Sequence, residues 1–230
     1  MLTLKIYQII TYIIRPLFFI FFIIRILNNK EEKGKFFERK GFSKNKKPAG
    51  TLIWIHAASV GETLSALPLI ERLVDFSPDY NILLTTGTKT SKNLISERNL
   101  KRVVHQYFPW DAKSYCDRFL NNWRPDIAIF IESEIWPNHL IQTKKKEIPI
   151  ILVNARMTEK SQVRWFKFKK TISHLLSVFS LIISQDSTSE KRLKELGAKN
   201  VLTYGNLKHD SEMLPYSSKI FSEFEISSSG

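Results

Sequence analysis

The chain has 230 residues, of which 43% are hydrophobic, so it can bury a core and does not belong to the disordered class. Its 35 lysines and arginines against 22 aspartates and glutamates give a formal charge of +13, which indicates an anionic partner such as a membrane surface, a phosphorylated lipid or a nucleic acid. Nucleic acid is disfavoured, because the sequence has no zinc finger, no RNA-binding aromatic motif and no long basic helix.

The first segment is strongly apolar. Residues 1–27 are mostly Ile, Leu, Phe and Tyr, interrupted by Lys5, Arg15 and Pro16. A bilayer span needs about 20 such residues, but a central arginine is costly in hydrocarbon, so the segment either spans imperfectly or lies partly embedded. It ends without a small-x-small cleavage site, which favours a retained membrane anchor helix over a cleaved signal peptide. We expect this anchor to be separable from the domain that begins near Thr51.

A basic stretch follows at residues 28–50, where lysine and arginine far outnumber glutamate. By the positive-inside rule, this places the rest of the chain on the cytoplasmic face of the cell inner membrane. The same cations could hold the headgroups of an anionic membrane surface. The alternative, a solvated linker with ordinary surface lysines, stays open.

Short apolar runs alternate with amphipathic helical stretches over residues 51–210. Such runs, when nearly continuous and separated by helices, are typical of a parallel sheet covered on both faces. The sequence therefore predicts an α/β fold, a Rossmann-like parallel sheet domain with six or seven strands. The predicted strands are residues 52–56, 82–86, 103–108, 127–131, 148–153, 181–184 and 201–204.

Polar residues follow the predicted strands, at the edge of such a sheet where ligands bind. Turn chemistry accounts for the Gly, Asn, Ser and Thr among them, but it does not call for long charged side chains. Carboxylates and cations on one rim indicate acid/base chemistry or capture of a polar, charged ligand. The candidate site residues are Ser59, Gly61, Glu62, Thr86, Glu132, Glu134, Asn154, Arg156, Asn206 and Lys208.

Four strings carry a resemblance to a known family: HAASVGE at His56–Glu62, ESEIWPN at Glu132–Asn138, NAR at Asn154–Arg156 and GNLKHD at Gly205–Asp210. In order and spacing they resemble the N-terminal domain of the 3-deoxy-D-manno-octulosonic acid (Kdo) transferases, and the resemblance covers essentially the whole chain. It implies the acceptor-binding half of a GT-B glycosyltransferase. Such an enzyme transfers Kdo from CMP-Kdo to lipid A precursor (lipid IVA) with inversion, in the synthesis of the lipopolysaccharide inner core, and uses no metal or other cofactor.

The resemblance also implies roles for the rim residues. Glu62 corresponds to the general base, and Glu132 and Lys208 to residues that stabilise the transition state. The other candidates, from Ser59 to Asn206, are expected to bind substrate. Two structural alternatives stay open: Glu62 as a helix-capping acid, and Glu132 as a partner of Arg156 or Lys208.

Two small departures from the family pattern leave the resemblance intact. Ser133 stands where threonine is more usual and keeps the hydroxyl, and His209 stands where phenylalanine is more usual. Neither His209 nor the single cysteine, Cys116, has the paired spacing of a metal site.

The donor-binding half that the resemblance implies does not follow Asp210 in this sequence, and residues 211–230 are expected to be a truncated tail. Two hypotheses remain. The chain is a Kdo transferase whose C-terminal half is supplied elsewhere, or it is a catalytically silent membrane-bound fragment that binds lipid A precursor. An unrelated nucleotide-binding protein is disfavoured because the sequence has neither GxGxxG nor a P-loop.

Overall fold

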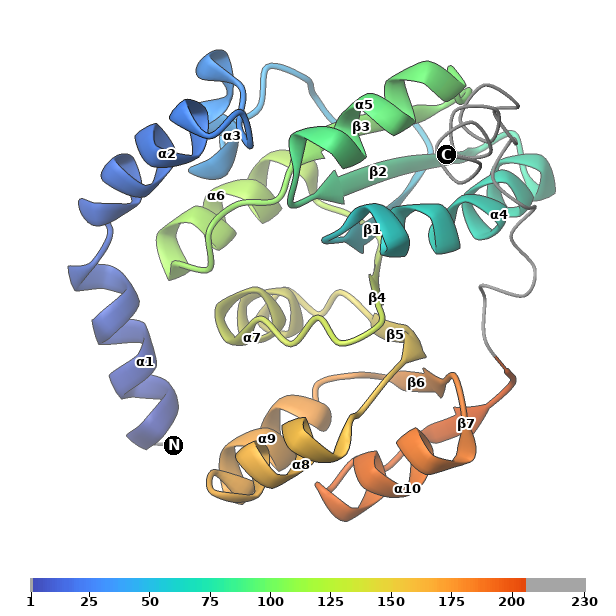
Figure 1. Ribbon diagram of the computed structural model, residues 1–230. Coiled ribbons are helices and arrows are strands. Elements are labelled where there is room, and N and C mark those ends of the chain that lie inside the picture. Colours follow the sequence, from blue (N-terminus) through green and yellow to red (C-terminus); the bar gives the residue numbers. More distant parts are fainter. Residues whose placement is uncertain (1, 206–230) are drawn as a thin grey trace, which may run out of the picture.

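The core of the protein is a seven-stranded, all-parallel sheet with strand order β3-β2-β1-β4-β5-β6-β7 (Figure 1). The computed structural model describes residues 2–205. The Rossmann-like fold predicted from the alternating runs is confirmed. The strands are β1 (Thr51–Ala57), β2 (Tyr80–Thr86), β3 (Val103–Tyr107), β4 (Ile127–Ile131), β5 (Ile150–Ala155), β6 (Leu181–Ser184) and β7 (Val201–Thr203).

Helices cover both faces of the sheet because each central strand is apolar on both sides. Along β1, Leu52 and Trp54 pack into one core, and Ile53 and Ile55 pack into the other, as the twofold alternation of a strand requires. The second core is closed by α4 and α5, and the first mainly by α6, α7 and α9. The helices that follow the strands are α4 (Val60–Phe76), α5 (Lys89–Arg98), α6 (Lys113–Trp123), α7 (Pro137–Lys145), α8 (Glu159–Phe166), α9 (Lys169–Leu176) and α10 (Ser187–Glu195).

The apolar N-terminal segment forms two helices where one was predicted. They are α1 (Leu2–Ile13) and α2 (Leu17–Leu27), which meet at a bend of 66°. Pro16 lies in the break, where it cannot donate a backbone hydrogen bond to the preceding turn. Among residues 2–205 no single helix is long and apolar enough to cross a bilayer, although this pair together has the required length and composition.

One face of the α1–α2 pair is packed on the domain. Tyr7 donates a hydrogen bond of 2.8 Å to the buried carboxylate of Asp111, and Arg15 donates one of 3.0 Å to Ser114. The Phe22 ring is buried against Phe36, with a centroid distance of 5.1 Å. Removing residues 1–27 would therefore expose core side chains and leave the Asp111 carboxylate without one donor, a cost that the sequence did not indicate.

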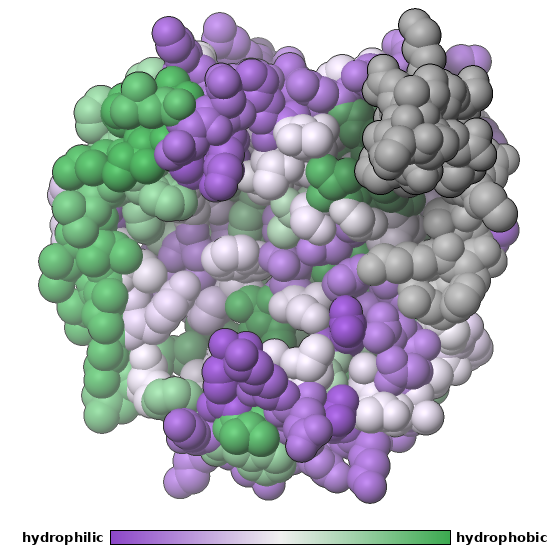
Figure 2. Space-filling model, viewed as in Figure 1, coloured by the Kyte–Doolittle hydropathy of each residue, from purple (hydrophilic) through white to green (hydrophobic). Residues whose placement is uncertain are grey.

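The other face of the pair is exposed and apolar, and it forms the continuous hydrophobic band along one side of the molecule in Figure 2. Soluble surfaces seldom carry a contiguous apolar patch of this kind without a partner. The exposed side chains are Leu2, Ile6, Ile9, Ile10, Tyr12, Ile13, Leu17, Phe19, Ile20, Phe21, Ile23, Ile24 and Leu27.

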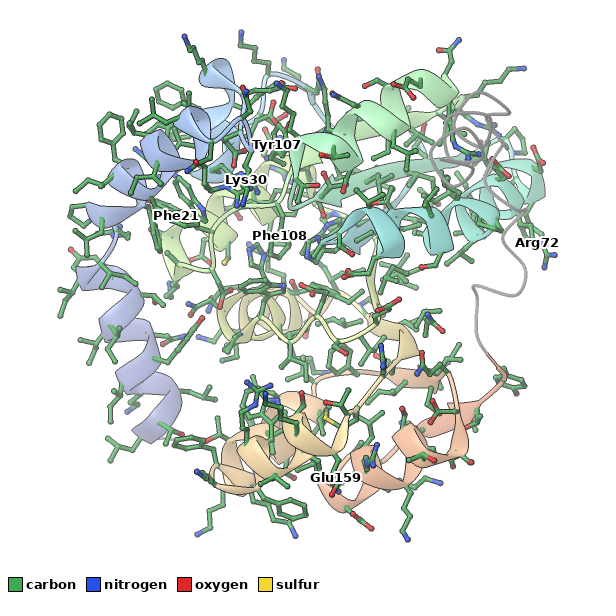
Figure 3. The ribbon with its side chains drawn as sticks, in the orientation of Figure 1. Phe21, Lys30, Arg72, Tyr107, Phe108 and Glu159 are labelled. Carbon is green, nitrogen blue, oxygen red and sulfur yellow. The ribbon has the colours of Figure 1, made fainter. Side chains whose placement is uncertain are left out.

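The stretch from residue 28 to 50 is fastened to the sheet by a buried ion pair. It contains η1 (Lys33–Lys35) and α3 (Phe36–Arg39). The guanidinium of Arg39 lies 2.8 Å from Glu31 and donates to the carbonyl oxygens of Gly87 and Phe108, each at 2.9 Å. It also lies over the ring of Tyr107, which Figure 3 shows beside Phe108.

A glycine turn completes the attachment of this stretch. Gly41 has a φ of +81°, and a Cβ there would come within 2.2 Å of the Tyr115 carbonyl oxygen in α6. Only glycine fits both the left-handed backbone and the close approach. Some charged residues of this stretch, Glu31 and Arg39 among them, thus hold it on the domain.

Candidate functional site

The predicted rim lies where the strand order reverses. Within the sheet, β2 is the neighbour of β1 on one edge and β4 is its neighbour on the other edge. Ligands of open α/β sheets bind at this switch point, outside the carboxyl ends of the strands. Glu62 follows β1 and Glu134 follows β4, so the two acidic residues come from the neighbouring strands that flank the switch point.

Glu62 occupies the third position of α4 and closes a capping box. Ser59 is the N-cap, and its hydroxyl accepts a hydrogen bond of 3.3 Å from the Glu62 amide. The Glu62 carboxylate in turn accepts from the Ala58 amide at 2.7 Å and from the Ser59 hydroxyl at 2.9 Å. The capping role considered from the sequence is therefore present, and it fixes the carboxylate beside the carboxyl end of β1, at the switch point.

Glu134 is held by two aromatic side chains. The indole of Trp136 donates a hydrogen bond to its carboxylate, and Nε2 of His56 lies 3.4 Å from the same oxygen. His56 is buried at the end of β1 and stacked on Phe108, with ring centroids 3.6 Å apart. Its Nδ1 lies 3.1 Å from the Thr85 hydroxyl. His56 thus links β1 and β2 to the carboxylate after β4.

The two carboxylates have opposite pKa shifts. Burial, followed by the negative charge of Glu134, raises the pKa of Glu62 above its ordinary value, despite its hydrogen bonds and the nearby His56. Burial also acts to raise the pKa of Glu134, but His56 and the Trp136 hydrogen bond outweigh it and hold that pKa below its ordinary value. Two acids whose pKa values diverge in this way can take different roles, one as a base and the other as a fixed anion.

Glu132 and Asn154 occupy strained backbone positions at neighbouring strand ends. Their φ angles are 61° and 57°, in the left-handed region that disfavours a side chain. Asn154 coincides with an irregularity in the pairing of β5 with β6, and Ser133 ties the two strand ends together by donating to the carbonyl of Arg156 at 2.6 Å. Such irregularities concentrate at sites that aim side chains at a ligand.

The remaining candidate residues differ in their exposure and their contacts. Ser59 and Gly61 are exposed at the start of α4, and Arg156 is exposed after β5. The Thr86 hydroxyl lies 2.9 Å from Nε2 of His105. Asn206 and Lys208 lie outside the described residues. His56 is a site residue that the sequence does not indicate, because a histidine at the end of an apolar strand carries no sign of its contacts with Thr85 and Glu134.

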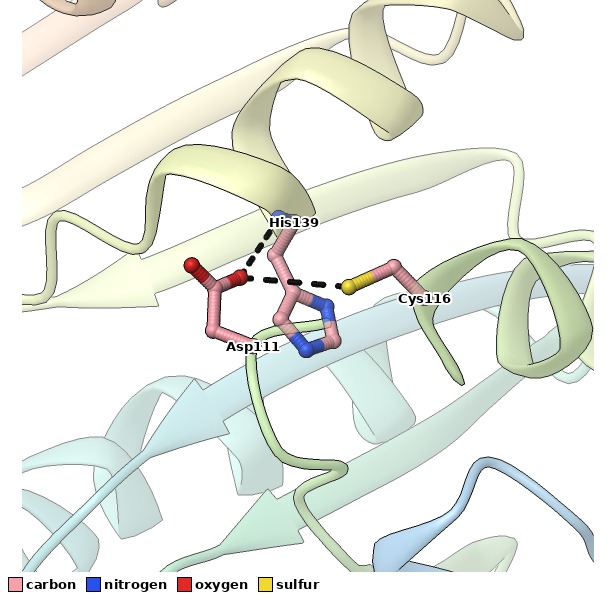
Figure 4. A group of neighbouring side chains, drawn as sticks. All are labelled: Asp111, Cys116 and His139. Atoms are coloured by element: carbon pink, nitrogen blue, oxygen red, sulfur yellow. Dashed lines mark hydrogen bonds between the residues drawn. The ribbon is translucent and has the colours of Figure 1, made fainter. Parts of the chain in front are cut away.

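A second polar cluster, Asp111, Cys116 and His139, is a structural hydrogen-bond site (Figure 4). Asp111 accepts from Tyr7, from the amides of Asn138 and His139 and from the Cys116 thiol. Burial raises the pKa of the Cys116 thiol well above its ordinary value and lowers that of His139 to about 3. The four hydrogen bonds that the Asp111 carboxylate accepts account for the close approach of these side chains.

The parallel sheet and its rim define a Rossmann-like α/β domain. The S. aureus MnaA-UDP co-structure is similar with a TM-score of 0.58 and 12% identity, over 76% of this chain and 51% of that chain. A structure titled UDP-N-acetylglucosamine 2-epimerase is similar with a TM-score of 0.55 and 12% identity, over 76% of this chain and 54% of that one. These likenesses show the fold.

The sequence model of the family described as 3-deoxy-D-manno-octulosonic-acid transferase (kdotransferase) matches residues 34–211. The chain belongs to this family. The 3-deoxy-D-manno-octulosonic acid transferase of Rickettsia bellii is 37% identical over 211 residues, which are 92% of this chain and 50% of that protein. That of Haemophilus influenzae is 34% identical over 201 residues, 86% of this chain and 47% of that protein. The chain spans about half the length of these curated relatives.

Proposed function

We propose that this chain is the acceptor-binding half of an inverting glycosyltransferase that moves Kdo from CMP-Kdo to lipid A precursor (lipid IVA). The supporting observation is the carboxylate of Glu62, held at the switch point with a raised pKa in a chain of the Kdo transferase family. A base works best when its pKa lies closer to the working pH, and a partly buried carboxylate at a ligand rim meets that condition.

The proposed reaction is a single displacement. The acceptor hydroxyl oxygen forms a bond to the anomeric carbon of Kdo, while the bond from that carbon to the phosphate oxygen of CMP breaks. CMP leaves with the electron pair, and Glu62 takes the hydroxyl proton as the new bond forms. A single displacement by the acceptor oxygen inverts the configuration at the anomeric carbon.

The other rim residues complete the proposal. Glu132 and Lys208 would stabilise charge in the transition state, with the Lys208 cation offsetting negative charge on the donor or its leaving phosphate. Glu134 would be the fixed anion that tunes Glu62, in addition to contacting substrate. Substrate contacts are assigned to Ser59, Gly61, Thr86, Asn154, Arg156 and Asn206.

Removing the negative charge of Glu134 should change the pH dependence of transfer. In Glu134→Gln, one cause that raises the pKa of Glu62 is absent, so that pKa falls towards its ordinary value. Transfer requires ionised Glu62, so the acid limb of the rate profile should move to lower pH. The measurement is kcat against pH for the variant and the wild type, each combined with a supplied C-terminal half to give a two-half enzyme. An acid limb that stays in place would show that Glu134 does not tune the base.

The α1–α2 pair would hold the chain on the cytoplasmic face of the inner membrane, close to its lipid acceptor. Its exposed apolar face and its polar contacts with the domain suit a helix pair lying in the bilayer interface.

We expect triple replacement of Ile20, Ile23 and Ile24 by serine to abolish pelleting with membranes in high salt, because all three side chains are exposed on α2. Phe76→Ser, at an exposed apolar position of α4, is the control. Unchanged pelleting of the triple variant would contradict the anchor, whereas wild-type pelleting lost in high salt would implicate the basic stretch.

The function is tested by a transfer assay with CMP-Kdo and lipid IVA, run with and without a supplied C-terminal half. We expect the 230-residue chain alone to bind lipid IVA without transferring Kdo, and the two halves together to transfer it. Turnover by the homogeneous chain alone would contradict the assignment of the donor site to the other half. Lipid IVA binding without turnover in either arm would favour the catalytically silent fragment.

A further inference from the structure

The corner between α8 and α9, residues 160–170, exposes apolar side chains inside a ring of positive charge. Val163 and Phe168 are each 56% exposed and Phe166 is 41% exposed. Figure 2 shows an apolar patch surrounded by hydrophilic atoms over these helices, at the lower edge of the molecule. The cations of the corner, all exposed, are Lys160, Arg164, Lys167, Lys169 and Lys170.

The exposed side chains are not needed for the core of the domain. On the inner side of the same helices, Ile172, Leu175 and Leu176 are fully buried, and Trp165 packs against the same core. The helix pair thus already has its internal contacts, and the outward aromatic residues are additional. Large apolar side chains that stay in water without an internal role indicate a partner.

The corner adjoins the proposed anchor. Thr3 in α1 and Thr171 in α9 share a hydrogen bond of 2.6 Å between their hydroxyl groups. Leu2, beside Thr3, is 74% exposed. The apolar surface of α1 therefore reaches the α8–α9 corner through a direct contact, although the two segments are far apart in the sequence.

The charge of the corner selects the kind of partner. Its five cations outnumber two nearby acids. The Glu159 side chain is 81% exposed and lies 3.8 Å from Arg192, and Glu195 accepts a hydrogen bond of 2.6 Å from Gln162 in α8. Aromatic side chains within a collar of lysine and arginine match the interface of a bilayer, where rings enter the headgroup region and cations meet anionic phosphates.

We propose that the α8–α9 corner is a second lipid-binding element that inserts Phe166 and Phe168 into the headgroup region of an anionic bilayer. Together with the adjoining α1–α2 pair, it extends the surface of the domain that contacts the membrane. This inference deepens the proposed membrane location and rests on it, but it is independent of the transfer reaction.

Site-specific fluorescent labelling tests the proposal in the full chain. Cys116 is fully buried, so a thiol-reactive, polarity-sensitive dye will label an introduced surface cysteine. The three labelling variants are Phe168→Cys at the corner, Ile23→Cys on α2 and Asn93→Cys on α5 as a control. The probes are vesicles of phosphatidylglycerol and of phosphatidylcholine.

We expect the dye emission to shift to the blue at positions 168 and 23 with phosphatidylglycerol vesicles, and less with phosphatidylcholine, but not at position 93. Replacing both Phe166 and Phe168 by serine should weaken binding to phosphatidylglycerol vesicles about tenfold or more, because the free energy gained by transferring each ring from water into the headgroup region is lost. A shift at 23 without one at 168 overturns this inference alone. No shift at either position overturns the membrane location as well, and an equal shift at 93 shows adsorption without a defined face.

Discussion

Replacing Glu62 with glutamine is expected to lower the rate of Kdo transfer by roughly 10²- to 10⁴-fold, the usual contribution of a general base. Glutamine keeps the size of the side chain and can still accept the hydrogen bond from the Ala58 amide that now reaches Glu62 at 2.7 Å. Its amide group cannot take the hydroxyl proton. The loss should therefore appear in kcat, with little change in stability or in affinity for the acceptor.

The measurement is steady-state transfer by the two-half enzyme, with thermal unfolding of each variant in parallel. Glu71→Gln is the matched control, because Glu71 is an exposed glutamate on the same helix. Glu134→Gln is unsuitable as a neutral control, because its charge acts on Glu62. If Glu62→Gln kept most of its turnover, or lost it only through unfolding, Glu62 would be a capping residue and Glu132 the next candidate for the base.

Replacing Glu31 with alanine is expected to lower the free energy of unfolding by about 3–5 kcal/mol, as found when one partner of a buried ion pair is removed. The Glu31 side chain is 0% exposed and that of Arg39 is 6% exposed. Without Glu31, the guanidinium of Arg39 would stay buried with no carboxylate, and with only the carbonyl oxygens of Gly87 and Phe108 and the Tyr107 ring as partners. A loss of this size is a large fraction of the stability of an ordinary domain.

Urea unfolding followed by circular dichroism measures this loss. Glu32→Ala is the control, since Glu32 lies next in the sequence and pairs with Lys92 at 3.0 Å, with both side chains more exposed than those of Glu31 and Arg39. A partly exposed pair of this kind contributes at most about 1 kcal/mol. Equal midpoints for Glu31→Ala and wild type would show that the pair does not hold residues 28–50 on the sheet.

The fold was predictable because its strands are apolar on both sides and its helices are not. All seven runs identified in the sequence are strands, and their boundaries differ from the observed ones by a few residues. The same pattern places polar residues on one rim, since parallel strands end at the same edge of the sheet. This is why Glu62 and Glu134, more than seventy positions apart in the sequence, could be expected near one another.

Contacts between distant segments could not be read from the sequence. Glu31 and Arg39 belong to a stretch of mixed charge that looks solvated, and their burial depends on carbonyl groups at the ends of β2 and β3. Similarly, the bend of 66° between α1 and α2 follows from inward contacts of Tyr7 and Arg15 as well as from Pro16. The hydropathy of residues 1–27 indicates the length of the apolar segment, but not its bend or its contacts with the domain.

The left-handed backbone at Glu132 bears on how this site is maintained in evolution. A residue other than glycine costs about 1–2 kcal/mol at such a φ angle. Glycine, however, has no carboxylate to offer at the end of β4. Under the role proposed for Glu132, position 132 represents a trade-off between stability and activity, in which selection for function at the rim retains the glutamate despite the backbone cost.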